Sequence, residues 1–233
     1  MTRRVVGILG GMGPEATILL QQRLLKKVNA RDDAEHLPLL IDMNPQVPSR
    51  IAHLIEGHGE NPGPVLAAMA RRLVNVGATA LAMPCNTAHN YAPFIVEAVP
   101  VPFLDMVTLS ISAARKSLPD GTKVGILASP AVKLANVFDE PLRAAGLTAV
   151  WPEDADRMLA SIKMVKAHGT TPTALEILSN AATELTRNGA NLLFVACSEF
   201  SLMKHDLILD LPVIDTVDVL ATAIRNHTRT EES

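Results

Sequence analysis

Two cysteines are the residues best suited to chemistry in this chain, and both follow apolar runs. Cys85 comes after the run in ALAMPCNTAHN (80–90), and Cys197, 112 positions later, comes after the run in LLFVACSEF (192–200). A free thiol has a pKa of about 8.5, so roughly a few per cent is thiolate at neutral pH. Two such groups on opposite faces of one carbon can remove a proton from one side and supply one to the other. The residue types therefore predict inversion of a stereocentre, provided that the fold brings the cysteines together.

Short apolar runs alternate with segments of helical periodicity along the first half of the chain. Helices are predicted from Pro14 onward, where a proline and then an acid suit a first helical turn, and at 65–77 and 107–118. The predicted strands are 5–9, 38–43, 78–84 and 101–106. Strands that alternate with helices are typical of a parallel sheet covered by helices.

The same pattern then begins again. Three segments recur in order: VGIL at 6–9 and 124–127, GATALAMPCNTAH (77–89) and GANLLFVACSEF (189–200), and VPFLDMVTLSISAA (101–114) and LPVIDTVDVLATAI (211–224). Three ordered matches predict a duplicated α/β half. Each cysteine then follows the third strand of its half, at the strand end where open α/β sheets bind ligands. We expect both thiols to point into one cleft between the halves.

The predicted architecture is an α/β fold with two pseudo-symmetric domains, each a parallel four-stranded sheet flanked by helices, with the active site in the cleft between them. No Ser/Gly-rich linker separates the halves, so we expect them to pack closely. The predicted domains are 1–105 plus 216–233 for the first and 106–215 for the second.

The composition of the chain limits the classes of binding partner and the cellular compartment that we expect. Of the 233 residues 48% are hydrophobic and the net charge is −3, so no broad basic surface favours nucleic acid or anionic lipid. No run approaches 18 uninterrupted apolar residues, which argues against a membrane span, and the opening MTRRVVGILGG lacks the features of a cleaved signal. Two cysteines are too few for a disulfide framework. We therefore expect a cytoplasmic protein with reduced thiols.

Five motifs together resemble the aspartate/glutamate racemase superfamily, and most of all its aspartate racemase branch. They are GILGGMGPEAT (7–17), NPQVPSR (44–50), MPCNTAH (83–89), ACSEF (196–200) and PVIDTVDVL (212–220). The resemblance implies two Rossmann-like halves, usually in a homodimer, and a cofactor-independent racemase with Cys85 and Cys197 as acid and base. Glutamate racemases differ where this chain has Gly10-Gly11 and Glu199, which favours the aspartate branch.

The substrate-binding candidates come from the same motifs and from the turns after the cysteines. The resemblance implies that Arg50 and Lys166, the latter close to Lys163, hold a side-chain carboxylate, and an arginine can do so through two hydrogen bonds. Donors in the turns are expected to stabilise the α-carboxylate as it gains enediolate character. The predicted substrate-binding residues are Met12, Gln46, Arg50, Asn86, Thr87, Ser129, Lys166, Ser198 and Glu199. The expected substrate is aspartate or glutamate, with no pyridoxal phosphate, metal or nucleotide.

Some positions depart from the family pattern. Ala196 and Ser198 stand where the family usually has glycine and threonine, and ASPAV (128–132) replaces a threonine-rich turn with glycine. Pro130 in that turn removes an N–H donor. The sequence therefore leaves a second enzymatic hypothesis, a broad-range racemase of non-acidic amino acids or a related isomerase. The non-enzymatic hypothesis is an amino-acid-binding sensor.

Other signals have simpler interpretations. The GMGPEA segment at 11–16 fits a dinucleotide-binding pattern, which needs an acid at the end of the second strand. Asp32 and Asp33 precede that strand and Asp42 lies 29 residues past Gly13, so we expect close backbone approach to the substrate instead. Cys85 and His89 have the spacing of metal ligands on a helix but lack a third ligand, so His89 is predicted to cap a helix or support the cysteine. Asp105 and Asp215 are predicted N-caps. A disulfide between the cysteines is disfavoured, because a cleft for an amino acid keeps them apart.

Overall fold

The computed structural model describes residues 4–209 and 211–229, and its strands form two four-stranded parallel sheets. The first sheet has the order β2-β1-β3-β4, and the second has the equivalent order β6-β5-β7-β8. The strands are β1 (Val6–Gly10), β2 (Leu39–Met43), β3 (Ala80–Ala82), β4 (Phe103–Leu104), β5 (Lys123–Leu127), β6 (Thr148–Val150), β7 (Leu192–Val195) and β8 (Val213–Asp215). Two sheets with one topology confirm the predicted α/β architecture of two repeated halves.

The central strands are apolar, apart from Lys123 at the start of β5, because both of their faces are covered. Every residue of β1 is buried, as is all of β5 except Lys123 at its start. In the first sheet Val6 lies opposite Leu39 of β2 and Ala80 of β3, and in the second Val124 lies opposite Ala149 and Leu192. Burial on both faces is the reason that parallel strands read as continuous apolar runs rather than as alternating patterns.

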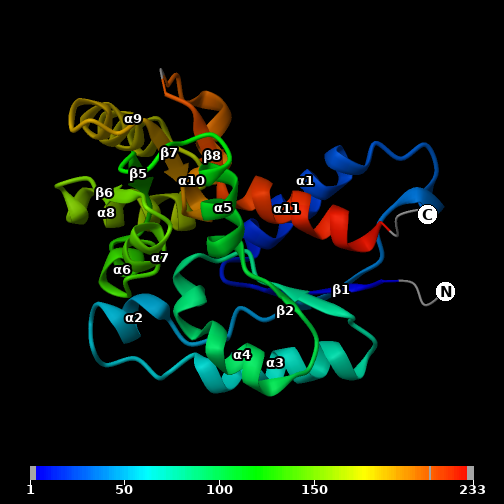
Figure 1. Ribbon diagram of the computed structural model, residues 1–233. Coiled ribbons are helices and arrows are strands. Elements are labelled where there is room, and N and C mark those ends of the chain that lie inside the picture. The colour runs from blue at the N-terminus through cyan, green and yellow to red at the C-terminus, as the bar shows by residue number, and fades with distance from the viewer. Residues whose placement is uncertain (1–3, 210, 230–233) are drawn as a thin grey trace.

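Helices flank both sheets (Figure 1). They are α1 (Pro14–Val28), α2 (Arg50–Leu54), α3 (Gly63–Asn75), α4 (Ala92–Ala98), α5 (Met106–Arg115), α6 (Pro130–Leu134), α7 (Asp139–Ala144), α8 (Ala155–His168), α9 (Pro172–Arg187), α10 (Ser198–Met203) and α11 (Thr216–Thr228), with 3-10 turns η1 (Asp33–Glu35), η2 (Thr87–Tyr91) and η3 (Lys204–Asp206). The carboxylates of Asp105 and Asp215 accept hydrogen bonds from the first turns of α5 and α11, which confirms both predicted N-caps. Within the described ranges, every helix is too short or too polar to cross a bilayer.

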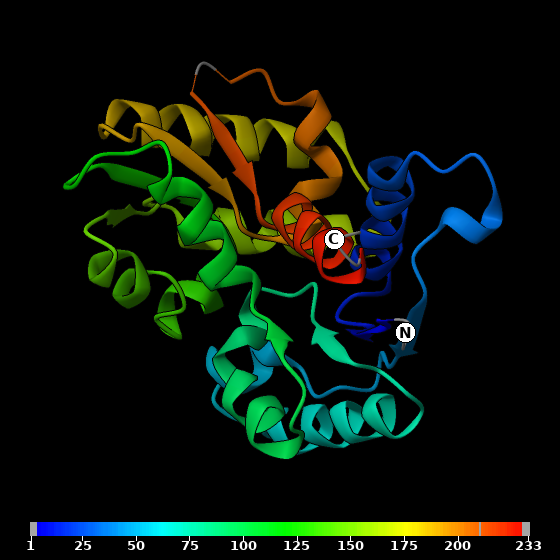
Figure 2. The ribbon, with the colours of Figure 1, turned by 45° about the vertical axis from the view of Figure 1, so that its right-hand side comes forward.

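The last helix returns from the second sheet to the first half. α11 directly follows β8, yet it packs against α1 and α5, and both views place it beside α1 (Figures 1 and 2). Its side chains Val217, Leu220 and Ile224 share one buried cluster with Val6 and Ile8 of β1. The chain therefore crosses between the halves at β8–α11. The predicted domain boundaries themselves stay a prediction.

Candidate active site

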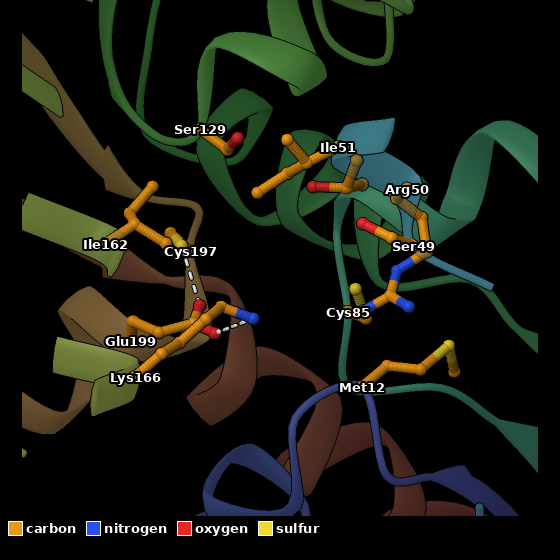
Figure 3. Close-up of a pocket in the computed structure, with 11 residues that line it drawn as sticks. Met12, Ser49, Arg50, Ile51, Cys85, Ser129, Ile162, Lys166, Cys197 and Glu199 are labelled. Carbon is orange, nitrogen blue, oxygen red and sulfur yellow. Dashed lines mark hydrogen bonds and ion pairs between the residues drawn. The ribbon is translucent and has the colours of Figure 1, made fainter. Parts of the chain in front are cut away.

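Both cysteines reach one pocket between the two halves. Cys85 follows β3 and Cys197 follows β7; both are free thiols and nearly buried, with 7% and 8% of their surface exposed. Figure 3 shows the two sulfur atoms on opposite sides of the pocket. The pocket is lined by Met12, Ser49, Arg50, Ile51, Cys85 and Thr87 from the first half and by Ser129, Ile162, Lys166, Cys197 and Glu199 from the second. The fold thus brings the thiols together as the repeat predicts.

The pocket is small. Its free volume is about 70 Å³, and one water molecule needs about 10–15 Å³ of such space. The space therefore holds several water-sized groups between two walls that belong to different halves.

A tight contact joins the loop that carries Met12 to the loop after β2. Gly11 has a φ of +91°, and a Cβ at this position would lie 2.4 Å from the backbone carbonyl carbon of Asn44. Only glycine tolerates both the conformation and the approach. The N–H of Gly11 donates to the hydroxyl of Thr17 at 3.0 Å, which joins the loop to α1. The contact holds the loop after β1 against the loop after β2, which leads to Arg50.

Arg50 supplies a positive charge to the pocket from the start of α2. The hydroxyl of Ser49 caps this helix by accepting from the N–H of Ala52 at 3.2 Å. The guanidinium of Arg50 donates to the carbonyl oxygens of Val47, at 3.3 Å, and Pro48, at 3.1 Å. Among residues 4–209 and 211–229, Arg50 has no acidic side chain within ion-pair distance. Its charge is therefore available to an anionic group in the pocket.

The opposite wall carries a connected set of polar groups around Cys197. The thiol donates to Oε2 of Glu199 at 2.9 Å, and the hydroxyl of Ser198 donates to the same oxygen at 3.3 Å. The other carboxylate oxygen, Oε1, lies 2.9 Å from Nζ of Lys166. Figure 3 shows this chain running from the lysine through the carboxylate to the sulfur.

This environment keeps Cys197 protonated. Burial raises the pKa of the Cys197 thiol well above its ordinary value, and the charge and hydrogen bond of Glu199 raise it further. Lys166 and the backbone N–H of Glu199 act in the opposite direction without reversing the shift. A thiolate beside a carboxylate in a buried site is unfavourable, so the proton stays on sulfur.

Glu199 and Lys166 form an ion pair. Burial alone would raise the pKa of Glu199, but the Lys166 charge and the hydrogen bonds from Cys197 and Lys166 hold it below its usual value. Burial alone would lower the pKa of Lys166, but Glu199 first and then both cysteines raise it above its usual value. Lys166 lines the same pocket as both thiols.

Cys85 is held through its backbone by a neutral histidine. Nδ1 of His89 donates to the carbonyl oxygen of Cys85 at 2.8 Å, and Nε2 accepts from the N–H of Met106 at 3.2 Å. Burial lowers the pKa of His89, although Asp105 and the Cys85 carbonyl act to raise it. The predicted supporting role of His89 is confirmed. The described part of the chain contains no group of three or more side chains able to hold a metal ion.

Six of the nine predicted substrate-binding residues line the pocket, and three do not. Gln46 is exposed, with its N–H bonded to the side chain of Asn44 at 3.0 Å. Asn86 is buried, and its amide nitrogen donates to Thr216 at 2.9 Å. Ser198 is buried behind Glu199. A contact of these three residues with substrate stays a prediction.

The turn at Ser129 begins a helix. The Ser129 hydroxyl oxygen accepts from the N–H of Ala131 at 3.3 Å, and Pro130 occupies the first position of α6. A proline there loses no hydrogen bond, because that N–H has no partner in a helix. On α8, Lys166 lines the pocket, whereas Lys163 is exposed and does not.

The sequence does not indicate three of the residues that line the pocket. Ser49 is the cap of α2, and a serine ahead of a short helical segment is the signal that could have indicated it. Ile51 and Ile162 have no such signal, because an isoleucine on a helix face usually marks the core. Ile162 is itself almost fully buried, with 2% exposed.

Comparisons with known proteins agree with this arrangement. The model of the Asp/Glu/Hydantoin racemase family matches residues 9–224. An aspartate racemase from Picrophilus torridus is 29% identical with a TM-score of 0.84, over 97% of this chain and 94% of that chain. The broad specificity amino-acid racemase RacX of Bacillus subtilis (strain 168) is 25% identical over 227 residues, 93% of this chain and 95% of RacX.

The fold extends to more distant proteins. A glutamate racemase from Francisella tularensis subsp. tularensis SCHU S4, solved in complex with D-glutamate, has a TM-score of 0.67 at 16% identity, over 100% of this chain and 86% of that chain. At this identity the likeness concerns the fold of two parallel sheets.

Proposed function

Because the chain belongs to the Asp/Glu/hydantoin racemase family and is an amino-acid racemase, we propose that it interconverts the enantiomers of an acidic amino acid through Cys85 and Cys197. The observation that carries the proposal is the pair of free thiols on opposite sides of one small pocket. One sulfur removes the α-proton, and the other delivers a proton to the opposite face of the same carbon. Neither step requires a bound cofactor, since both proton carriers are side chains.

The environment of Cys197 sets its role in the first inversion. The Glu199 carboxylate keeps the proton on Cys197, so we assign the proton-donating role to Cys197 and proton removal to the sulfur on the opposite face. After one inversion Cys85 carries a proton and Cys197 is a thiolate beside Glu199. The reverse reaction starts from that second state. Each cysteine therefore acts as the base for one enantiomer.

The α-carboxylate must be stabilised while the α-carbon loses its proton. The turns after the cysteines begin at Asn86 and Cys197 without a side-chain cap, so their first N–H groups lack that partner. Such donors, together with the hydroxyl of Thr87 on the pocket wall, suit the developing enediolate charge. We assign the α-carboxylate to these turns.

A side-chain carboxylate would then face Arg50. Its guanidinium is unpaired with any acid of the described chain, and a bidentate arginine–carboxylate contact is strong and directional. Lys166 stands on the other side, already paired with Glu199. The homodimer and the cytoplasmic location expected from the sequence belong to the same proposal.

A second substrate class is favoured by a different observation. Ile51 and Ile162 give the pocket apolar surface, and the Lys166 charge is already neutralised by Glu199. Both features suit a neutral side chain, and RacX is named as a broad specificity racemase. Racemisation rates for the proteinogenic L-amino acids decide between the two. Turnover of neutral amino acids with none of aspartate or glutamate would replace the acidic assignment.

The thiol scheme is tested by α-proton exchange in deuterated water with Cys85→Ala and Cys197→Ala. We expect each variant to lose racemisation, since inversion needs a proton carrier on both faces. A single remaining thiol can still wash deuterium into one enantiomer without inverting it. Full racemisation by either variant would refute the scheme, and binding without exchange in the wild type would indicate a sensor.

A further inference from the structure

The crossing from β8 to α11 touches the turns of both cysteines. Asp215 is the last residue of β8 and Thr216 the first of α11. Both side chains are buried, with 2% and 0% of their surface exposed. They therefore lie at the point where the chain leaves the second sheet for the core of the first half.

Asp215 is connected to Cys197 through one residue. Its Oδ1 accepts from the hydroxyl of Ser201 at 2.9 Å. The N–H of Ser201 donates to the carbonyl oxygen of Cys197 at 3.0 Å, and its hydroxyl lies 3.3 Å from the same oxygen. The carboxylate thus holds the first turn of α10, which begins at the cysteine.

Thr216 is connected to the turn of Cys85. Its hydroxyl donates to the carbonyl oxygen of Val195 at 3.2 Å, so it must accept from the amide nitrogen of Asn86, at 2.9 Å. Asn86 directly follows Cys85, while Val195 ends the strand that precedes Cys197. One hydroxyl therefore bridges the two cysteine-bearing segments.

Arg23 of α1 fixes the junction from the first half. Its Nη1 lies 2.7 Å from Oδ2 of Asp215 and 3.0 Å from Oδ1 of Asp218, and its Nη2 donates to the carbonyl oxygen of Ser201 at 2.9 Å. A buried ion pair whose two members also bond to Ser201 holds one geometry, because breaking it would leave an uncompensated charge.

We propose that Thr216 and Asp215 are positioning residues that set the separation and orientation of the two thiol-bearing turns. Thr216 acts on the Cys85 turn through Asn86, and Asp215 acts on the Cys197 turn through Ser201. The inference rests on the proposed two-thiol reaction. In the repeat, Thr216 corresponds to Met106, which has no hydroxyl, so helix capping alone does not explain the threonine.

A change in the separation of the two thiols has a distinctive effect on the rates of inversion and deuterium uptake. Removal of the α-proton requires one thiol, whereas inversion requires a second thiol in place on the other face. A displacement on the order of 1 Å costs about 100-fold in a well-oriented reaction. A misplaced second thiol therefore allows deuterium to enter the starting enantiomer while inversion slows. Loss of folded protein, by contrast, lowers both rates equally.

The test is Thr216→Val in the full chain, with one enantiomer of aspartate, or of the best substrate found, in deuterated water. Inversion and deuterium uptake into the unconverted enantiomer are measured in the same reaction. We expect the ratio of inversion to retained exchange to fall at least about tenfold. Thr216→Ser keeps the hydroxyl and should restore the wild-type ratio. Ser201→Ala is the second variant, and we expect the same direction from the Cys197 side.

Thr222→Val is the matched control, because it makes the same change in α11, where the hydroxyl bonds only to the carbonyl oxygen of Asp218, at 2.9 Å. Its ratio should equal that of the wild type. A wild-type ratio in both Thr216→Val and Ser201→Ala would overturn the positioning role while leaving the thiol reaction intact. Full racemisation by Cys85→Ala or Cys197→Ala would overturn both.

Discussion

The two halves share one topology but hold their cysteines in different ways. Two residues after Cys85 stands Thr87, whereas two residues after Cys197 stands Glu199, whose carboxylate accepts a hydrogen bond from the thiol at a sulfur–oxygen distance of 2.9 Å. Four residues after each cysteine, a side chain bonds to the cysteine carbonyl: the ring Nδ1 of His89 to Cys85, and the hydroxyl of Ser201, together with its N–H, to Cys197. The backbone support is thus conserved across the repeat by different side chains, while the groups that control the proton are not.

This difference shows that a symmetric scaffold need not give two thiols the same environment. Burial and Glu199 raise the pKa of Cys197, so its thiol holds the proton more firmly than a free thiol does. Among the residues that the structure describes, the only acidic side chain on the pocket wall belongs to the second half, and the arginine without an acidic partner belongs to the first. Three experiments examine this asymmetry.

The largest expected effect comes from replacing Arg50 of the first half, which has no acidic partner among the described residues. Arg50→Met should lower kcat/KM for aspartate about 100-fold, since a hydrogen bond to a charged group contributes about 1.5–3 kcal/mol. The rate for alanine, if detectable, should change little, and the exposed Lys163→Met serves as control. Steady-state racemisation of both substrates measures this. Equal losses for aspartate and alanine would show that Arg50 does not hold the side-chain carboxylate.

An intermediate effect is expected from replacing Glu199 of the second half, which accepts a hydrogen bond from Cys197. Glu199→Gln keeps the size of the side chain but removes its charge, so the pKa of Cys197 should fall. At pH 8 the thiolate fraction then rises about tenfold for each unit of that fall. Iodoacetamide should therefore alkylate Cys197 faster, while Cys85 reacts at an unchanged rate, as measured by peptide mass spectrometry. Exposed Glu60→Gln is the control. Unchanged alkylation of Cys197 would remove Glu199 as the cause of the asymmetry.

The smallest expected effect is on the pH dependence of the free energy of unfolding, through His89 of the first half. His89 has a lowered pKa in the folded state because it is buried, so below about pH 6.5 the unfolded chain takes up a proton that the folded chain does not. The free energy of unfolding should therefore fall as the pH drops from 7.5 to 5.5, and it should fall less in His89→Gln. Urea unfolding at both pH values measures this, with exposed His58→Gln as control. An identical pH dependence in wild type and His89→Gln would contradict the assignment.

The fold could be predicted from the sequence because parallel strands leave unbroken apolar runs and the duplication repeats them. The lengths of the strands are harder to predict from the sequence. The run at 78–84 gives only the three-residue β3, since Pro84 cannot donate a ladder hydrogen bond and the chain turns toward Cys85. Likewise β4 has two residues within the run at 101–106, because Asp105 already caps α5.

Part of the chemistry of the site can also be predicted from the sequence. The cysteines stand out because the repeat places both at equivalent strand ends. Ile51 and Ile162 look like core residues, since sequence alone does not reveal which face of a helix meets a cavity. The bond between Asn86 and Thr216 joins positions 130 apart and in different halves. No local pattern predicts such a partner, because it depends on how the two sheets are placed.

The return of α11 to the first half has a consequence for the order of assembly. Residues Val217, Leu220 and Ile224 complete the core around β1, although they are made after every strand of both sheets. During synthesis the second sheet can therefore finish while the first still lacks one of its covering helices. The half that emerges first from the ribosome is the last to be completed, and until then its apolar surface is open to chaperones and to aggregation.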